Sequence, residues 1–566
     1  MLAEKYVKIN YKSYDDFIKN CKIQVPKNFN FGFDVVDEIA NTNPNKKAIM
    51  WRNPKGEERI FTFGDIKKES NRAANFFKSL GIKKGDAVMM MLKRRYEYWH
   101  CAIALHKLGA LMIPTTHLLT VRDIEYRVKT VDVKIIIAAA DKRIADVVNE
   151  VRKDLPSLEN VISVNGKIDG WIEYSKEIAK FSDIFKRPTD LQATSASDKS
   201  LLYFTSGTTG APKMVCHDFA YPLGHILTAR FWQNLDDGSL HLTVADTGWA
   251  KASWGKLYGQ WLCGSCVFIY DYERFEPRDL MEKITKYGVT SFCAPPTVYR
   301  HIIKEDFSKY DLSKLKYAET AGESLNPEVF YRFKEMTGLE IKEGFGQTET
   351  VVLAATFPWM KVKPGSVGKP SAGWDIDIVD SENNPCESGQ EGHLIVRTGK
   401  QKPVGLFLNY YKDDDMTKNA WSNGIYDTGD IAYKDEEGYI WFVGRSDDII
   451  KSSGYRIGPY EVESALMEHP CVLECAITGV PDEIRGAVIK ATVVLAKEYQ
   501  PSPELVTELQ NHVKKITAPL ISSGWDIDIV NSENNPCESG QEGHLIVRTG
   551  KQKPVGLFLE ALLQIL

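Results

Sequence analysis

The chain has 566 residues, of which 43% are hydrophobic and 26% charged, and its formal net charge is −5. This length exceeds one hydrophobic core and predicts a globular protein of several domains. The slight negative charge excludes a strongly basic nucleic-acid-binding protein, and no apolar run reaches the roughly 18 residues that span a bilayer. Because the opening MLAEKYVKINYKSYDDF lacks the apolar core of a signal peptide, we expect a cytoplasmic protein.

The first part of the chain alternates helical and strand-like segments. FTFGDIKKESNRAANFFKSLGI has apolar residues at helical spacing and ends at Gly81, a residue suited to a helix C-cap. A predicted buried strand, KKGDAVMMMLKR, follows, and a second alternating stretch runs from about Ser239 to Phe357. This order is typical of parallel sheets built from strand–helix units, so we predict two α/β subdomains.

The pattern changes after KPGSVGKP. Short alternating strands and turns dominate from Trp374 to Val443, whereas helices and strands mix again beyond Gly444. The predicted fold class is therefore α/β, with a large N-terminal domain followed by a small mobile α+β C-terminal domain. The predicted bounds are 1–444 for the N-terminal domain, including a small β-barrel-like subdomain at about 358–443, and 445–566 for the C-terminal domain.

Two of the ten cysteines, Cys263 and Cys266, have C-x-x-C spacing. One interpretation is a redox pair, which requires a thiol at the start of a helix. The other is a buried strand, because the flanks GQWL and VFIYDY are apolar. We favour the strand, and no second C-x-x-C or histidine cluster in the sequence completes a zinc site.

The stretch Tyr203–Lys213, YFTSGTTGAPK, combines glycines, hydroxyls and a lysine directly after a predicted strand. Glycines let backbone N–H groups approach phosphate oxygens, hydroxyls donate hydrogen bonds, and Lys213 adds positive charge. The spacing differs from the Walker-type loop G-x-x-x-x-G-K-[ST]. We interpret the stretch as a phosphate-binding loop; the alternative is a flexible surface turn.

Three later stretches give weaker signals. Gly344–Thr350, GFGQTET, offers an aromatic ring that can stack on a purine and a carboxylate, Glu349, that can hold Mg²⁺ beside a triphosphate. Tyr426–Asp430, YDTGD, carries a carboxylate suited to ribose hydroxyls, although Asp-Thr-Gly also marks tight turns. Gly444–Arg456, GRSDDIIKSSGYR, surrounds a Ser-Ser-Gly loop with basic side chains, or forms a solvated linker. Alone, none of the three identifies a site.

Together and in this order, the motifs resemble the adenylate-forming superfamily, and most closely its short- and medium-chain acyl-CoA synthetases. ADTGWAKASWG and TAGESL match two further motifs of that family. The resemblance implies a two-step reaction: a carboxylate attacks the α-phosphate of ATP to give acyl-AMP and pyrophosphate, and the CoA thiol then takes the acyl group and releases AMP. It implies ATP, Mg²⁺, coenzyme A and a small carboxylic acid as cofactors and partners, and leaves a homodimer open.

The resemblance also implies roles for individual residues, assigned by their positions in the matching motifs. The catalytic candidates are Thr205, Lys213, Glu349 and Arg456, and the Mg²⁺ candidates are Glu349 and Thr205. The nucleotide-binding candidates are Ser206, Gly207, Thr208, Thr209, Gly210, Gly322, Glu323, Ser324, Phe345, Gly346, Gln347, Thr348, Asp430 and Arg445. The hinge candidate is Asp447, the thioester-loop candidate is Gly454, and the acyl-pocket candidates are Trp249, Trp254 and Lys256, with Cys293 nearby.

The end of the chain departs from this family. Residues 524–559 repeat residues 373–408 with one change, Asp380 to Asn531, through a duplication or an error of gene assembly. Members of the family close on P-K-T-x-x-G-K, whose last lysine contacts the reacting carboxylate and the α-phosphate, and no such segment follows Pro519. Lys551 either replaces that lysine or shares its Gly-Lys letters by coincidence, the interpretation we favour.

The copy has three structural alternatives: it forms a hairpin, it pairs with the C-terminal domain, or it remains poorly ordered. We expect an acyl-CoA ligase that is impaired in adenylation. The functional alternatives are a nucleotide-binding pseudoenzyme of the same fold and an enzyme that only converts supplied acyl-AMP to acyl-CoA. Short, branched and medium acyl chains all fit the sequence.

Overall fold

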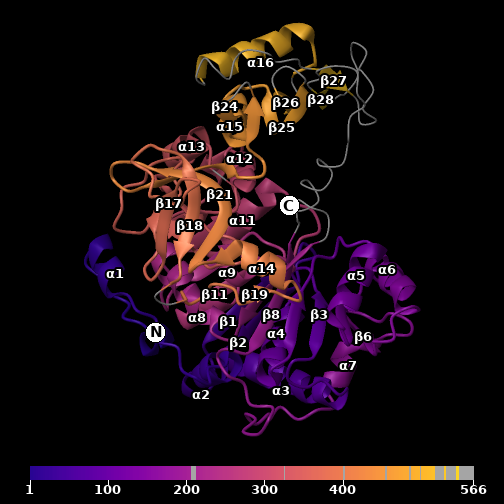
Figure 1. Ribbon diagram of the computed structural model, residues 1–566. Coiled ribbons are helices and arrows are strands. Elements are labelled where there is room, and N and C mark those ends of the chain that lie inside the picture. The colour runs from indigo at the N-terminus through magenta and orange to yellow at the C-terminus, as the bar shows by residue number, and fades with distance from the viewer. Residues whose placement is uncertain are drawn as a thin grey trace.

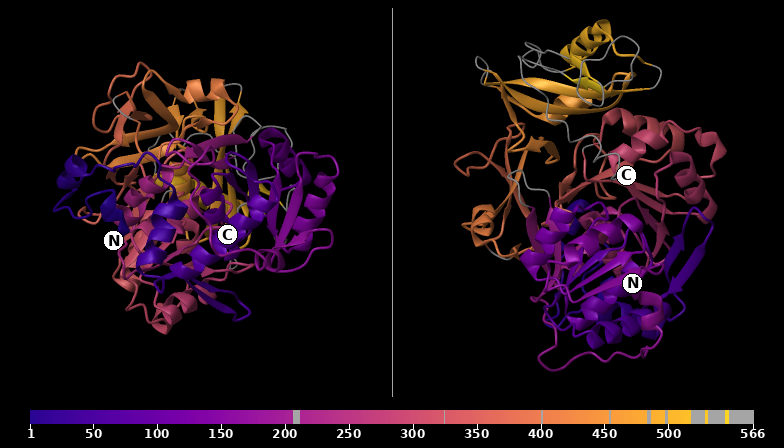
Figure 2. Two further views of the ribbon diagram at one scale, coloured as in Figure 1. Left: turned by 90° about the horizontal axis from the view of Figure 1, so that it is seen from below. Right: turned by 90° about the vertical axis from the view of Figure 1, so that its right-hand side faces the viewer.

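The computed structural model shows a large N-terminal part with three sheets and a small C-terminal part (Figure 1). Figure 1 and the right view of Figure 2 place the yellow C-terminal elements beyond the orange and pink segments, away from the purple first third of the chain. Among the helices that the structure describes, none is both long and apolar enough to cross a membrane. The described residues are 1–205, 212–323, 325–399, 402–452, 455–482, 486–496, 499–516, 528–530 and 544–546.

The first sheet has eight strands in the order β19-β9-β8-β4-β3-β5-β6-β7. It is parallel from β8 to β7, and β9 and β19 extend it in antiparallel fashion. Every residue of β3 is buried, as expected for an apolar strand in a covered parallel sheet. The strands are β3 (Ala87–Met91), β4 (Leu111–Pro114), β5 (Ile135–Ala139), β6 (Asn160–Val164), β7 (Ile172–Glu173), β8 (Lys199–Thr205), β9 (Lys213–Asp218) and β19 (Asn409–Tyr410).

The second sheet has nine strands in the order β16-β15-β14-β13-β12-β10-β11-β1-β2. It is parallel from β14 to β1, and β2, β15 and β16 pair in antiparallel fashion. The strands are β1 (Lys47–Arg52), β2 (Glu58–Thr62), β10 (Leu240–Thr243), β11 (Cys266–Tyr270), β12 (Ser291–Ala294), β13 (Tyr317–Thr320), β14 (Ile341–Phe345), β15 (Ala354–Ala355) and β16 (Lys369–Pro370). The predicted mixed α/β architecture is confirmed.

The longest helix of the N-terminal part begins and ends where the sequence predicts. Thr62 caps α3 by accepting a hydrogen bond from the backbone N–H of Asp65, and Gly81 follows the helix in the left-handed region, at φ +85°. The helices of this part are α1 (Tyr14–Asn20), α2 (Glu38–Thr42), α3 (Phe63–Ser79), α4 (Glu97–Leu108), α5 (Val121–Val131), α6 (Lys142–Arg152), α7 (Tyr174–Ile178), α8 (Tyr221–Ile226), α9 (Ala250–Gly255), α10 (Tyr258–Leu262), α11 (Pro277–Tyr287), α12 (Pro296–Ile302), α13 (Pro327–Thr337) and α14 (Asp414–Ala420).

The C-x-x-C pair lies between α10 and β11. Cys263 follows the C-terminal end of α10, and Cys266 begins β11. Both cysteines are free, and burial raises the pKa of each thiol to about 12. A redox thiol needs a lowered pKa, so the raised pKa values of both thiols favour the strand interpretation over the redox pair.

The third sheet is antiparallel and contains the strands of the predicted β-rich subdomain. Its order is β17-β18-β21-β20, and β22 pairs with β21 outside that path. Among the described strands, β20 is only two residues long and pairs with β21. The barrel-like shape and the bounds of this subdomain stay predictions. The strands are β17 (Asp375–Val379), β18 (Gly392–Arg397), β20 (Trp421–Ser422), β21 (Ile425–Lys434) and β22 (Ile440–Arg445).

The C-terminal part is built on a long antiparallel hairpin of β25 and β26, against which α15 packs. Its buried core includes Val462, Leu466, Ala491 and Leu509, from both helices and from β26. This mixture agrees with the predicted α+β character. The elements are β23 (Ile450–Ser452), β24 (Tyr455–Ile457), α15 (Pro459–Met467), β25 (Val472–Asp482), β26 (Gly486–Leu495), α16 (Pro503–Ile516), β27 (Asp528–Val530) and β28 (His544–Ile546).

The repeated sequence forms the same hairpin twice. Ile378 of β17 faces Leu394 of β18, and the equivalent Ile529 of β27 faces Leu545 of β28. β28 also pairs with β26, so the copy both forms a hairpin and joins the sheet of the C-terminal part. Identical strand sequences select the same register, because the side-chain pattern sets it. Lys551 lies outside the described residues.

Candidate active site

A hairpin of the first sheet carries both described ends of the predicted phosphate loop. Thr205 ends β8 and Lys213 begins β9, and the two residues stand opposite each other in the antiparallel register. The ammonium of Lys213 lies 5.8 Å from the centre of the Tyr410 ring. Outside the described residues lie Ser206, Gly207, Thr208, Thr209, Gly210, Ser324 and Gly454, and the side chain of Arg456 in β24.

Glu349, in the loop after β14, is hydrogen-bonded to the same edge of the first sheet. Its Oε1 accepts a hydrogen bond of 2.9 Å from the hydroxyl of Tyr410, and its backbone carbonyl accepts one of 2.8 Å from Phe407 N–H. Tyr410 belongs to β19, which pairs with β9 beside Lys213. Burial and the Glu349 carboxylate raise the pKa of Tyr410, which therefore stays protonated and donates. Tyr410 thus binds the Glu349 carboxylate, and the ammonium of Lys213 lies 5.8 Å from its ring.

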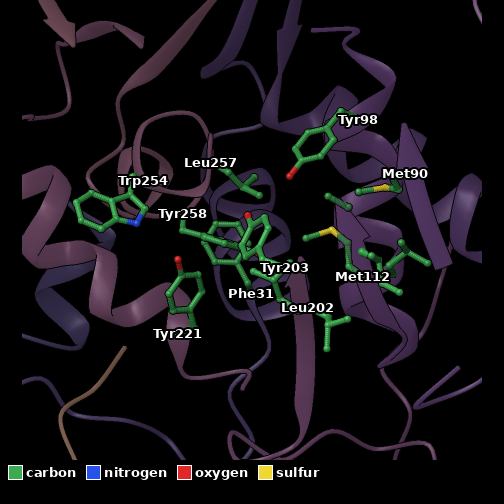
Figure 3. Packing of buried hydrophobic residues seen from close by; sticks show 14 of the residues in the cluster. Phe31, Met90, Tyr98, Met112, Leu202, Tyr203, Tyr221, Trp254, Leu257 and Tyr258 are labelled. Carbon is green, nitrogen blue, oxygen red and sulfur yellow. The ribbon is translucent and has the colours of Figure 1, made fainter. Parts of the chain in front are cut away.

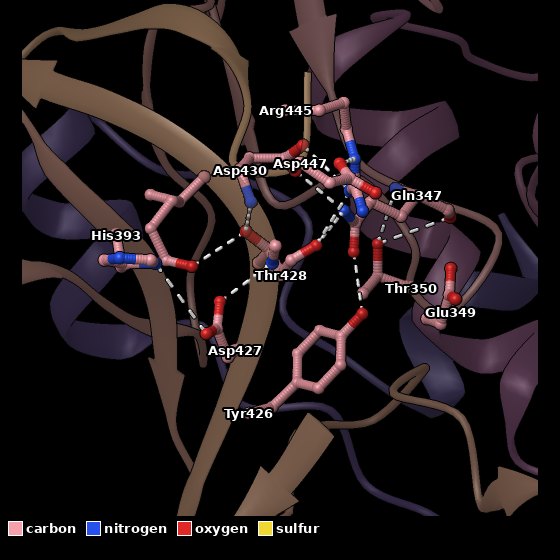
Figure 4. A network of polar contacts seen from close by, with 12 residues as sticks. Gln347, Glu349, Thr350, His393, Tyr426, Asp427, Thr428, Asp430, Arg445 and Asp447 are labelled. Carbon is pink, nitrogen blue, oxygen red and sulfur yellow. Dashed lines mark hydrogen bonds and ion pairs between the residues drawn. The ribbon is translucent and has the colours of Figure 1, made fainter. Parts of the chain in front are cut away.

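Gln347 and Asp430 form the centre of a polar network (Figure 4). The Gln347 amide nitrogen donates to Asp430 Oδ2 at 2.7 Å, and its amide oxygen accepts from the Tyr426 hydroxyl at 2.7 Å. Arg445 Nη1 donates to Asp430 Oδ1 and to the Thr428 carbonyl, both at 3.0 Å. Asp430 and Arg445 are direct neighbours across β21 and β22, so the sheet itself aligns this ion pair.

Asp430 is 2% exposed, and burial raises the pKa of its carboxylate to about 6 even though Arg445 opposes the rise. A buried carboxylate with two donors in place is prepared to accept further hydrogen bonds from a ligand. Arg445 Nε also lies 3.5 Å from Asp447 Oδ1, just beyond the end of β22. The hinge role of Asp447 stays a prediction.

Phe345 is the last residue of β14 in the second sheet, and Gly346 follows it and packs against Trp254. The ring of Phe345 is 6.0 Å from that of Phe442 at 37°. A Cβ on Gly346 would lie 2.6 Å from the Val351 carbonyl oxygen and would overlap the ring of Trp254. Only glycine fits this contact. The backbone carbonyl of Thr348 is bound by His217 Nε2 at 2.7 Å, which secures the loop onto β9.

Gly322 and Glu323 follow β13 in the segment predicted to line the adenine pocket. Gly322 has φ +103°, and Lys251 donates to the carbonyl of the preceding Ala321. The Glu323 carboxylate is held by Thr297 on α12, whose hydroxyl donates to both oxygens at 2.8 and 3.1 Å. The side chain of Glu323 is therefore bound to α12. A purine at this segment would contact its backbone.

The three acyl-pocket candidates lie in different surroundings. Trp249 is 37% exposed before α9, whereas Trp254 is buried within the aromatic cluster of Figure 3, with His225 at 6.1 Å. Lys256 is buried, and its ammonium donates to the Ala245 carbonyl at 2.6 Å, while burial lowers its pKa to about 7. Cys293 is buried in β12. Trp254 is thus the buried aromatic residue of the three, and the acyl-pocket roles stay predictions.

Two family models match the chain. The model described as AMP-binding enzyme matches residues 36–411, and that of the AMP-binding enzyme C-terminal domain matches residues 461–533. The chain belongs to the AMP-binding enzyme family. The predicted superfamily is thereby confirmed, and the nucleotide motifs up to Thr350 lie within the first match.

Relatives of this AMP-binding enzyme are acyl-CoA synthetases. Acyl-coenzyme A synthetase ACSM3, mitochondrial, of Mus musculus is 39% identical over 521 residues, covering 90% of this chain and 89% of the relative. Anthranilate CoA ligase AuaEII, solved with anthranoyl-AMP, has 27% identity and a TM-score of 0.80 over 88% of this chain and 92% of its own. Brucella canis acyl-CoA synthetase has 28% identity and a TM-score of 0.72 over 91% and 94%.

The predicted magnesium ligands of this AMP-binding enzyme are Glu349 and Thr205. Among the described residues, no group of three or more His, Cys, Asp and Glu side chains could hold a metal. Mg²⁺ in nucleotide sites takes one or two carboxylates and completes its shell with phosphates and water. Glu349, held by Tyr410, supplies one such carboxylate, so the residues present fit a Mg²⁺ that arrives with a triphosphate.

Sequence reasoning missed two tyrosines of the site. Tyr410 binds Glu349, and Tyr426 binds Gln347, across 61 and 79 positions of the chain. Tyr426 is the first residue of the YDTGD motif, but the motif does not indicate which residue its hydroxyl binds. The only signal for Tyr410 is its place in LNYYKDDD, which is not specific for any contact.

Proposed function

We propose that this AMP-binding enzyme is an acyl-CoA ligase for a short- or medium-chain carboxylic acid. The acid oxygen attacks the α-phosphate of ATP, the bond to pyrophosphate breaks, and acyl-AMP forms. The CoA thiol then attacks the acyl carbonyl, loses its proton, and AMP leaves. The observation that carries the proposal is the network of Asp430, Gln347 and Arg445. The loop that carries Gln347 is bound to β9 through the hydrogen bond between His217 and the Thr348 carbonyl.

Each described group has a task in this reaction. Asp430 accepts hydrogen bonds from the ribose, and Lys213 and Thr205 bind phosphate oxygens and offset their negative charge. Tyr410 holds Glu349 at the end of β9, where Glu349 would hold Mg²⁺. Mg²⁺, when bound, neutralises charge that develops on the phosphates.

We further propose that adenylation is slow in this chain, because the resemblance expects a lysine loop where the copy of residues 373–408 stands. The test compares two measurements: pyrophosphate release from ATP and Mg²⁺ with acids of two to about eight carbons, and acyl-CoA formation from supplied acyl-AMP and CoA. We expect thioester formation to exceed pyrophosphate release by about a hundredfold or more. Fast pyrophosphate release that survives Lys551→Ala would contradict the proposal.

The copy also supports a second candidate, a nucleotide-binding pseudoenzyme. It predicts AMP and ATP binding by calorimetry with neither pyrophosphate nor thioester formed. Thioester formation from acyl-AMP would exclude the pseudoenzyme, and absence of nucleotide binding would exclude both candidates. Sequencing of the transcript across residues 515–566 would establish whether the chain carries the copy.

Acyl chain length should depend on Trp254. We expect Trp254→Phe to shift binding of acyl-adenylate analogues toward longer chains, because a smaller ring leaves room in the buried cluster. One methylene is worth about 1 kcal/mol, so the preference should change by roughly fivefold for each carbon accommodated. Trp249→Phe, at the exposed position, is the matched control and should leave the preference unchanged.

We also propose a cytoplasmic location. The relative from Mus musculus is named as mitochondrial, which makes the location of this chain worth testing directly. Fractionation of cells that express the tagged full chain should recover it in the cytosol. Recovery in the mitochondrial matrix would overturn this proposal without affecting the proposed reaction.

A further inference from the structure

Three neighbouring strands of the second sheet, β10, β12 and β13, have a buried face that carries polar side chains. Successive residues of a strand point to opposite faces of its sheet. Leu242 and Phe292, which are direct neighbours in the register, belong to one apolar core cluster. The opposite face carries His241, Ser291 and Glu319, which are 0%, 3% and 0% exposed. Burial of such groups costs free energy unless they bind one another.

These side chains form a continuous chain of hydrogen bonds that ends at Thr243. The hydroxyl of Ser291 donates to Glu319 Oε1 at 2.9 Å and lies 2.8 Å from His241 Nδ1. His241 Nε2 lies 2.7 Å from Thr243 Oγ1. Both ring nitrogens are therefore engaged, so the imidazole cannot turn over without losing two hydrogen bonds. Burial lowers the pKa of His241 to about 3 and raises that of Glu319, so the chain is uncharged at neutral pH.

The hydroxyl of Thr243 supports α9. Gly255, the last residue of α9, packs so closely on Thr243 that an added Cβ would lie 2.0 Å from its Oγ1 and 2.6 Å from its Cβ. The oxygen atom is thus held between His241 and the helix. Because protein interiors are close-packed, a larger group in its place moves the helix.

The position of α9 determines the position of Trp254, the residue before Gly255. Its ring, part of the aromatic cluster in Figure 3, packs so closely on Gly346 that an added Cβ there would lie 2.4 Å from Trp254 Cη2. Gly346 precedes Gln347, whose amide donates to Asp430 at 2.7 Å. A sequence of direct contacts therefore leads from the polar chain through α9 to the candidate site.

We propose that His241 and Thr243 are positioning residues for the acyl group. The hydrogen bonds from Glu319 through Ser291 hold His241, which holds the Thr243 hydroxyl. Thr243 then sets the distance of α9, and of Trp254, from the sheet. The inference rests on the proposed function in taking Trp254 as a wall of the acyl site.

The test measures, by calorimetry, the affinities of adenosine and of non-hydrolysable acyl-adenylate analogues for the full chain. Thr243→Val replaces the hydroxyl by a methyl group, which cannot bind His241 and presses on Gly255. We expect analogues with acyl chains of about four to eight carbons to bind at least about fivefold more weakly, and the affinity for adenosine to change less than about twofold. Thr243→Ser, which keeps the hydroxyl, should retain the acyl affinity of the unchanged chain.

Two further variants show whether the effect passes through α9. Gly255→Ala adds a methyl group to the same contact from the helix side, so it should weaken the acyl analogues in the same way. Thr290→Val is the matched control, because the hydroxyl of Thr290 accepts from the backbone N–H of Leu240 at the start of β10, at 2.9 Å. It should leave the preference for acyl analogues over adenosine unchanged.

Ser291→Ala tests the chain itself, because it leaves His241 Nδ1 without its partner. We expect acyl analogues to bind about threefold more weakly. Added to Thr243→Val, it should cause no further loss, because both substitutions break the same chain. Losses that add up would show that Ser291 acts independently of Thr243 and would overturn the inference.

An acyl affinity of Thr243→Val equal to that of the unchanged chain would also overturn it. So would equal losses for adenosine and for the acyl analogues, because they indicate a general loosening of the fold. Ser291→Ala provides the comparison if Thr243→Val does not fold. If the acyl group adds no affinity in the unchanged chain, the proposed function fails and the inference with it; if it does and Thr243→Val keeps that affinity, the inference alone fails.

Discussion

Adenosine will bind to Asp430→Asn at least about tenfold more weakly than to the unchanged chain, because a charged hydrogen-bond acceptor is worth roughly 1.5–3 kcal/mol. In the unchanged chain the affinity will fall as the pH drops through about 6, the raised pKa of Asp430. Protonation then removes the charge that accepts from Arg445 and from the ribose. Calorimetry with adenosine checks this, since adenosine lacks the phosphate that itself titrates near pH 6.

The free energy of unfolding should change with pH in the opposite direction to the adenosine affinity. The pKa of Asp430 rises from its ordinary value of 3.8 to about 6, mainly because burial disfavours the charged form. The folded protein therefore holds this proton more tightly than the unfolded chain between those values. The contribution of Asp430 to the free energy of unfolding is present below pH 3.8 and is lost as the pH rises through about 6. The ionised Asp430 carboxylate, which binds the ligand, therefore lowers the free energy of unfolding.

Asp427→Asn is the matched control, because Asp427 lies on the same strand but its side chain is 45% exposed. Its adenosine affinity should equal that of the unchanged chain and keep the same pH dependence. An affinity of the unchanged chain that stays constant from about pH 8 to about pH 5 would contradict the assignment of Asp430. Asp430→Asn should show no step near pH 6.

Gly368→Ala will lower the free energy of unfolding by about 3 kcal/mol. Gly368 has φ +92°, and an added Cβ would overlap the backbone of Ala355 on the neighbouring strand. Its carbonyl accepts from Ile440 N–H at 2.7 Å, so a shift of this residue also breaks the link between β16 and β22. The measurement is the midpoint of urea unfolding, compared between variants at equal pH.

Gly438→Ala separates the clash from backbone strain. Gly438 has φ +80° but nothing within 4 Å of the position of an added Cβ. Only the left-handed backbone then opposes the substitution, which costs about 1 kcal/mol. Equal losses in the two variants would show that the contact with Ala355 is relaxed in solution and would contradict the prediction for Gly368.

The sequence alone determined the elements and their kinds. The apolar run of β3 and the helical spacing of α3 are each formed by residues that are close together in the sequence. Such local patterns specify strand and helix. The strand predicted before the SGTTGAPK stretch is confirmed for the same reason, since Thr205 ends β8. The two hairpins of the repeat share one register because the same letters occur twice.

Only the tertiary structure decided which side chains meet. Tyr410 reaches Glu349 because β19 pairs with β9, a pairing of segments almost two hundred residues apart that no local pattern reports. The Glu323 carboxylate binds Thr297 and Arg300 on α12, contacts that the TAGESL motif does not indicate. Periodicity shows which face of an element is apolar. Which polar partner stands opposite depends on long-range packing, where each buried donor must find an acceptor.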